Sequence, residues 1–168
     1  ASLGMAAINS ALDPGGFRFH RLNAADLVLE KGRGKRVAVV GNFPFLEKLR
    51  PEMGELRVIY RQPSRAAEGV TEAQEFLPRA DVAAITGSSF ITGTAQQLLE
   101  LCPQAYTVVL GPSTPFSPVL FDYGVDAICG TLVKEPERAL PFILQGASFR
   151  RIEGLELLTA FKDEFGDG

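Results

Sequence analysis

The chain has 168 residues, of which 46% are hydrophobic and 22% charged, a composition typical of one folded domain and not of a disordered chain. The net charge of −3 gives no basic surface for nucleic acid. No apolar run approaches the roughly 20 residues that cross a bilayer, and two isolated cysteines make no disulfide framework. The sequence therefore predicts a cytoplasmic protein without a nucleic-acid or membrane partner.

Residues 1–35 are predicted to form a linker helix followed by a connecting segment. Met5, Ile8 and Leu12 share one helical face, and Asp13-Pro14-Gly15-Gly16 would end the helix. No N-cap residue precedes this helix, and the chain begins with Ala. We therefore expect a fragment whose missing N-terminal part packs against the helix.

Residues 36–150 are predicted to form a Rossmann-like domain. Apolar runs rich in β-branched residues end in glycine or polar turns, and we interpret them as five strands at residues 36–40, 56–60, 82–86, 106–110 and 127–129. These runs are apolar on both faces, which is typical of parallel strands covered by helices.

Two capping boxes lie between the expected strands. Thr71 with Gln74, and Thr94 with Gln97, form the Thr-x-x-Gln pattern that opens a helix. Strands that alternate with helices imply right-handed crossovers. The predicted fold class is α/β, a three-layer α/β/α Rossmann-like sandwich with a mostly parallel sheet of about five or more strands.

Proline and glycine mark further helix ends. Pro118 and Pro136 stand where a first helical turn accepts proline, and Gly124 and Gly146 follow as C-terminal stops. Pro141 predicts a kink in, or an early end to, the helix that begins at Pro136.

Residues 151–168 are predicted to form a C-terminal amphipathic tail. Leu155, Leu158, Phe161 and Phe165 have helical spacing. The short helix they predict is either a lid that packs on the sheet or an element of a homo-oligomer.

Polar turns follow three of the expected strands, at the edge where ligands bind in open parallel sheets. We expect the backbone amides at Gly41, Gly87 and Gly111 to face a shared pocket. The neighbouring side chains would add hydroxyl donors, those of Thr86, Ser88, Ser89, Ser113 and Thr114. Such donors, beside helix N-termini, suit a carboxylate or phosphate. The alternative is that tight turns need these residues for conformation alone.

Familiar cofactor motifs are absent. The chain has no Walker phosphate loop, and Gly41-Asn42-Phe43-Pro44 replaces the glycine-rich dinucleotide turn. The second strand ends in Tyr60-Arg61 instead of an acidic residue that would bind ribose. A conventional NAD or NADP site is therefore not expected, and the cofactor is unknown.

Catalytic and metal-binding side chains are sparse. His20 is the only histidine, no Gly-x-Ser-x-Gly elbow occurs, and Cys102 and Cys129 are expected in the core. One histidine and two distant cysteines make no closed soft-metal site. We predict no metal ligands and assign no catalytic residue.

Several motifs in register resemble the C-terminal domain of a family described as "putative heavy-metal chelation". They are Gly41-Asn42-Phe43-Pro44-Phe45, Asp81 before Thr86-Gly87-Ser88, Gly93-Thr94, Gly111-Pro112-Ser113-Thr114-Pro115 and Gly124-Val125-Asp126. Gly4-Met5-Ala6-Ala7-Ile8-Asn9 resembles the linker helix of that family. The resemblance implies a preceding α+β domain like the N-terminal domain of enolase. Arg61 departs from the family, which tends to carry an acidic residue there.

The resemblance implies a ligand pocket formed by eleven residues, Asn9, Gly41, Asn42, Phe43, Thr86, Gly87, Ser88, Gly111, Pro112, Ser113 and Thr114. None is a soft-metal ligand, so chelation would involve a bound organic ligand, a hard cation or the other domain. We expect the domain to bind a small anionic molecule or metal complex. The alternative is a transferase- or lyase-type enzyme whose site is completed by the missing N-terminal domain or a second subunit. The three loops are contiguous only if the first and third strands are neighbours.

Overall fold

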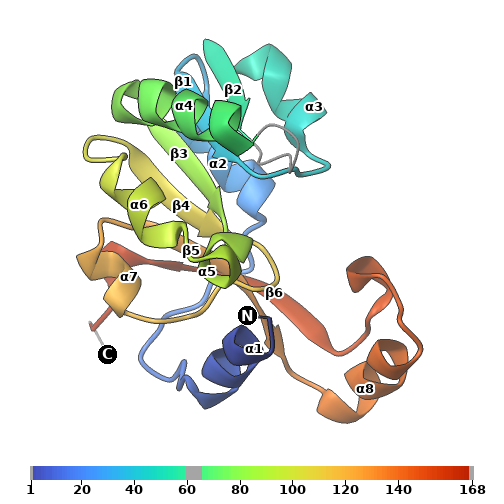
Figure 1. The fold of residues 1–168 in the computed structure, drawn as a ribbon. Coiled ribbons are helices and arrows are strands. Elements are labelled where there is room, and N and C mark those ends of the chain that lie inside the picture. The colour runs from blue at the N-terminus through green and yellow to red at the C-terminus, as the bar shows by residue number, and fades with distance from the viewer. Residues whose placement is uncertain (1, 60–65, 167–168) are drawn as a thin grey trace.

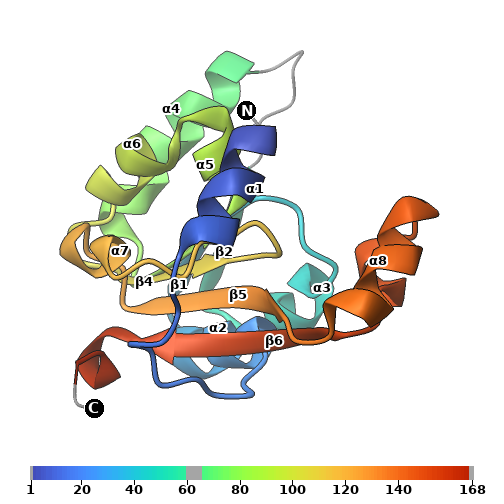
Figure 2. The same ribbon diagram turned by 90° about the horizontal axis from the view of Figure 1, so that it is seen from below.

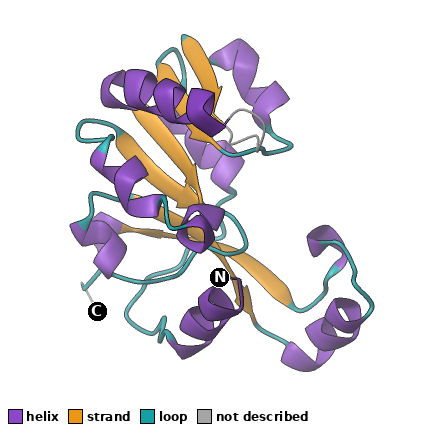
Figure 3. Cartoon of the chain, viewed as in Figure 1, coloured by secondary structure: helices purple, strands orange, loops and turns teal. Residues whose placement is uncertain are grey.

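A single mixed sheet forms the centre of the molecule (Figures 1 and 3). The structure, a computed structural model, describes residues 2–59 and 66–166. Its six strands follow the order β2-β1-β3-β4-β5-β6. The bounds are β1 (Arg36–Val40), β2 (Glu55–Ile59), β3 (Val82–Thr86), β4 (Tyr106–Leu110), β5 (Ala127–Val133) and β6 (Leu155–Phe161). The first five strands are parallel, and β6 pairs antiparallel with β5.

Helices cover both faces of the sheet, which confirms the predicted α/β sandwich with a mostly parallel sheet (Figure 2). One face carries α4 (Ala66–Phe76), α5 (Ser88–Thr92), α6 (Ala95–Glu100) and α7 (Val119–Asp122). The opposite face carries α2 (Ala24–Gly32) and α3 (Leu46–Leu49). The remaining helices are α1 (Ser2–Ala11) and α8 (Pro136–Leu144), with 3-10 turns η1 (Arg50–Glu52), η3 (Leu77–Arg79), η4 (Phe149–Arg151) and η5 (Lys162–Glu164).

The strands are apolar on both faces because each face packs a separate core. On one face Ala83 and Ile85 of β3 pack in the cluster that includes Leu77. On the other face Ala84 packs in the cluster that includes Leu49. All five predicted strands are found, although β5 was predicted to end at Cys129 and continues to Val133. Burial on both sides explains the apolar runs of the central strands.

The predicted C-terminal helix is wrong, because Leu155–Phe161 form strand β6. The antiparallel ladder joins Ala127 to Phe161 at one end and Val133 to Leu155 at the other. On its outer side Thr159 exchanges backbone hydrogen bonds with His20, at 2.8 and 2.9 Å. Without β6 the outer edge of β5 would leave its peptide groups unpaired, a cost that the ladder removes.

Helix α2 lies in the segment that was expected only to connect the linker helix to the first strand. The Asn23 side chain accepts a hydrogen bond from the backbone N–H of Ala25, at 2.9 Å, and so caps the helix. Leu27 and Val28 are fully buried against the sheet. This segment is therefore part of the core.

The helix-end signals have mixed outcomes. Thr94 directly precedes α6 as predicted, although its side chain bonds Thr92 and not the helix backbone. Thr71 lies inside α4, so the prediction that it opens a helix is wrong. Pro136 begins α8 as predicted, and that helix continues past Pro141 to Leu144 instead of ending early.

Two helices end at glycine in the left-handed region, as predicted. Gly124 has φ +83° after α7, and Gly146 has φ +67° after α8. Within the described residues, no helix is long and apolar enough to cross a membrane.

Candidate functional site

The loops after β1, β3 and β4 meet at the carboxyl edge of the sheet, because β3 lies between β1 and β4. A Cβ atom added to Gly41 would lie 3.0 Å from Cβ of Thr86. One added to Gly87 would overlap the Thr114 hydroxyl and lie 2.7 Å from the Thr114 backbone nitrogen. The loop after β3 therefore contacts the loop after β1 on one side and the loop after β4 on the other. The strand order 2-1-3-4-5 also places the topological switch point between β1 and β3.

The backbone amides of the three loop glycines do not face a pocket, contrary to our expectation. Each N–H extends the sheet ladder by donating to a neighbouring strand. Gly41 donates to the carbonyl of Ile59 at 2.9 Å, and Gly87 donates to that of Leu110 at 2.7 Å. Gly111 donates to the carbonyl of Cys129 at 3.0 Å. These donors are already used.

The next residues along two of the loops keep their donors. The backbone N–H groups of Asn42 and Ser113 form no hydrogen bond within the described residues. Gly41 and Gly111 both have φ +124°, a conformation that favours glycine and turns the chain sharply out of the strand. The turn therefore presents the following amide and not the glycine amide.

Two hydroxyl groups near this edge are enclosed without a partner. Ser89 and Thr114 are each only 3% exposed, and neither hydroxyl oxygen has a hydrogen-bond partner in the part of the chain described. A buried hydroxyl without a partner is costly. By contrast, the hydroxyls of Thr86 and Ser88 lie 3.0 Å apart and satisfy each other.

Helix α1 lies beside α5 and the loop after β4 (Figures 1 and 2). The Asn9 amide donates to the backbone carbonyl of Ser113 at 3.3 Å, and its carbonyl oxygen is buried without a partner among the described residues. Met5 is buried, whereas Ile8 is 54% exposed, so only part of the predicted apolar face contacts the domain.

The structure brings the eleven predicted site residues to one edge. Close contacts join Asn9 to Ser113, Gly41 to Phe43 and Thr86, and Gly87 to Thr114. Asn42, Ser88 and Pro112 are exposed at the rim. Their role as ligand contacts stays a prediction. Tyr60 and Arg61, after the second strand, lie outside the described residues.

The helix N-termini at this edge are weaker than expected. Helices α3 and α5, which follow β1 and β3, have only four and five residues. A helix dipole grows from aligned peptide units, so such short helices add little positive potential. Any anion at this edge would depend on hydroxyl and amide donors.

A family model described as "putative heavy-metal chelation", DUF364, matches residues 23–161, which is most of the chain. The chain belongs to the DUF364 family. This confirms the family predicted from the sequence motifs.

Two solved structures of DUF364 proteins, both titled as having unknown function, share the fold. The protein from Desulfitobacterium hafniense is 32% identical with a TM-score of 0.75, over 88% of this chain and 61% of that one. The protein from Pyrococcus horikoshii is 23% identical with a TM-score of 0.76, over 94% of this chain and 66% of that one. The chain thus spans less than two thirds of either relative. No curated protein matches it.

The described residues do not fit a direct soft-metal site, although the DUF364 description implies a metal. Among residues 2–59 and 66–166, no group of three or more His, Cys, Asp or Glu side chains could hold a metal ion. Cys102 and Cys129 pack in the cores on opposite faces of the sheet. Burial raises the pKa of Cys102 to about 12 and that of Cys129 to about 11, so both thiols stay protonated.

Proposed function

We propose that this DUF364 domain binds a small anionic ligand, free or as a metal complex, at the carboxyl edge between the loops after β1, β3 and β4. The observation that carries the proposal is the direct contact of these three loops, at Gly41 with Thr86 and at Gly87 with Thr114. Crevices at this switch point bind ligands in other open α/β sheets. A role in metal chelation or homeostasis is the interpretation that the family description favours.

The chemistry of the loops supports an anion over a cation. None of the eleven predicted site residues is Asp or Glu. The Ser113 side chain is a hydroxyl donor, and the Asn42 and Ser113 amides are unused among the described residues. Neutral N–H and O–H donors that converge at a turn bind carboxylates and phosphates.

The proposal extends to a second unit that would complete the crevice. The solved relatives are longer than this chain. The motif resemblance implies a preceding enolase-like domain. Leu3 and Ile8 of α1 are 85% and 54% exposed beside the site, and they offer such a domain an apolar contact.

Titration with inorganic phosphate, followed by amide NMR, tests the proposal. We expect the amide signals of Asn42, Ser88 and Ser113 to move together with one saturating curve. Ser113→Ala should weaken binding about tenfold, because a hydrogen bond to a charged group contributes roughly 1.5 kcal/mol.

The matched control is Ser148→Ala, since Ser148 is exposed and its side chain caps no helix. The control should bind phosphate like the unmodified chain. Amide shifts scattered over the surface, or equal affinities for the two variants, would overturn the proposal.

A further inference from the structure

A cavity lies at the amino edge of the sheet, opposite the carboxyl-edge loops. It has a volume of about 640 Å³, within the range of small-molecule sites. Tyr106 begins β4, Asp126 directly precedes β5, and Phe161 ends the antiparallel β6, so these three strand ends form its wall. The cavity is thus separate from the carboxyl-edge loops. This cavity was not predicted from the sequence, because the segment of β6 was expected to be a helix.

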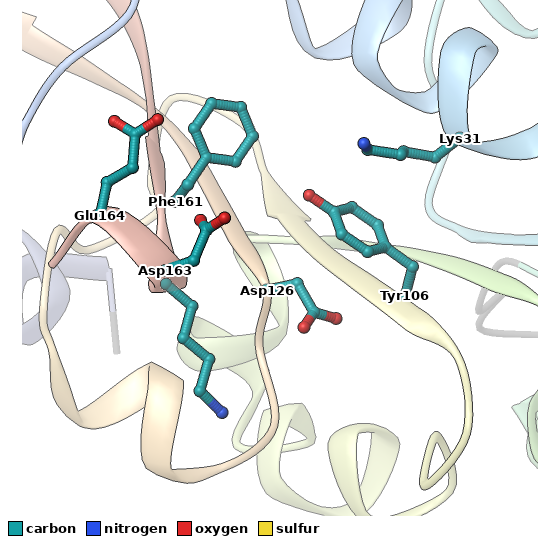
Figure 4. A pocket seen from close by; sticks show the side chains of 7 residues that line it. Lys31, Tyr106, Asp126, Phe161, Asp163 and Glu164 are labelled. Carbon is teal, nitrogen blue, oxygen red and sulfur yellow. The ribbon is translucent and has the colours of Figure 1, made fainter.

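Two aromatic rings and three carboxylates line this cavity (Figure 4). The Tyr106 hydroxyl points toward the Phe161 ring, and the Asp163 carboxylate lies beside Phe161. Asp126 lies beside Tyr106, with its carboxylate turned away from the two rings. The Lys31 ammonium lies 5.3 Å from the centroid of the Tyr106 ring. The lining thus combines apolar walls with acidic groups.

The ion pairs around the cavity leave its aspartates uncompensated. Lys31 pairs with Glu30 outside the lining, at 3.3 Å. The Glu164 carboxylate is occupied by His20, at 2.6 Å. Asp163 forms no hydrogen bond or ion pair with another described residue.

The second aspartate keeps one free oxygen. Oδ2 of Asp126 accepts the Thr107 backbone N–H at 2.7 Å, and no described residue donates to its Oδ1. Lys162 also lines the cavity. Glu164 pairs with Arg18 as well as His20, at 3.6 Å, so the two aspartates face the ammonium groups of Lys31 and Lys162, and Lys31 is shared with Glu30.

The field at the Tyr106 hydroxyl is negative. Burial raises the pKa of the Tyr106 phenol, and the negative charges of Asp126 and Asp163 raise it further. A negative field beside the partly buried rings of Tyr106 and Phe161 favours a cation that also has an apolar body. An anion is disfavoured by the same charges.

We propose that this cavity binds a small organic amine, with its ammonium group at Asp126 and Asp163 and its apolar body between Phe161 and Tyr106. The carboxylates neutralise the ammonium, and the rings remove the body from water and add cation–π attraction. The ligand class is a primary amine with an aromatic or aliphatic group.

Calorimetric titration with phenethylamine tests the proposal, with phenethyl alcohol as the uncharged probe of the same shape. We expect the amine to bind at least about fivefold tighter than the alcohol. Asp163→Asn should weaken amine binding about fivefold, consistent with the loss of one partly exposed charge pair. Phe161→Leu should weaken both probes, because it removes a ring and keeps an apolar side chain.

Asp122→Asn is the matched control, since Asp122 is exposed on α7 and does not line the cavity. It changes the net charge equally and should leave amine affinity unchanged. The proposal is overturned if the alcohol binds as tightly as the amine. It is also overturned if the Asp163 and Asp122 variants bind the amine alike.

Discussion

Replacement of Gly87 by alanine tests whether the loops after β3 and β4 touch as described. Gly87 has φ −59° and ψ −19°, values that alanine adopts freely, so the backbone of this residue is not strained by the change. The added Cβ would overlap the Thr114 hydroxyl and lie 2.7 Å from the Thr114 nitrogen and 2.9 Å from its Cα. The added Cβ would collide with backbone atoms of Thr114, which, unlike a side chain, cannot move aside by rotating about a side-chain bond.

The expected loss of stability follows from two opposing effects. Hydrogen bonds hold both sides of the contact, from Gly87 to Leu110 at 2.7 Å and from Thr114 to Gly111 at 3.1 Å. Overpacking of such a site costs roughly 1–3 kcal/mol. Alanine also lowers the conformational entropy of the unfolded chain, which stabilises the folded protein by about 0.4–1 kcal/mol. We expect the free energy of unfolding to fall by about 1–2 kcal/mol.

Urea unfolding, followed by circular dichroism, measures this loss in a chain that has no tryptophan. For a typical dependence of the unfolding free energy on urea concentration, about 2 kcal/mol per M, the urea midpoint should fall by about 0.5–1 M. Gly4→Ala is the control, because a Cβ at Gly4 in α1 meets nothing within 4 Å, and its midpoint should stay equal or rise. A Gly87→Ala protein as stable as the unmodified chain would refute the packing of these loops.

Two further predictions concern titratable groups away from the proposed site. Hydrogen bonds from the Arg36 side chain and backbone hold the pKa of Asp81 below its usual range. The ionised Asp81 carboxylate therefore stabilises the fold above about pH 4, and this stabilisation disappears as the pH falls and the carboxylate is protonated. Asp81→Asn should therefore lower the urea midpoint at pH 7, and the difference from the unmodified chain should shrink near pH 2; a constant difference would contradict this. Cys102 and Cys129 should not react with a disulfide reagent within minutes at pH 8 until urea unfolds the chain, and rapid reaction of the folded protein would contradict their burial.

The strands were predictable because their local signals agree with their tertiary setting. Residues 82–86 are apolar throughout, and both faces of β3 are buried between helices. The order of the strands was not predictable, because each crossover is compatible with several positions in the sheet. The contact between Gly41 and Thr86 depends on that order.

The two largest errors concern segments at the ends of the chain. Leu155, Leu158 and Phe161 fit helical spacing, but the available edge of β5 gives their backbone a complete ladder, and this tertiary pairing overrides the local period. Helix α2 did have a readable start in Asn23 followed by Asp26, a cap and an acidic first turn.

The carboxyl-edge loops were found from their glycines, but the chemistry of those glycines was misjudged. A glycine at the end of a strand suggests a free amide only when no neighbouring carbonyl is in register. In this sheet Ile59 accepts from Gly41, and Leu110 accepts from Gly87. That register belongs to the assembled sheet, so no local pattern reveals it. The backbone amides without a partner among the described residues lie one or more residues further along, as at Asn42.

The donor set also bears on what chelation could mean for this domain. A soft metal ion needs thiolate or imidazole ligands that converge, but Cys102 and Cys129 lie on opposite faces of the sheet and His20 already pairs with Glu164. In the proposed crevice, hydroxyl and amide donors would contact the anionic groups of a ligand and not the metal. A site of this kind selects its ligand by the placement of anionic groups, so it would bind the metal-free ligand and its metal complex through the same contacts.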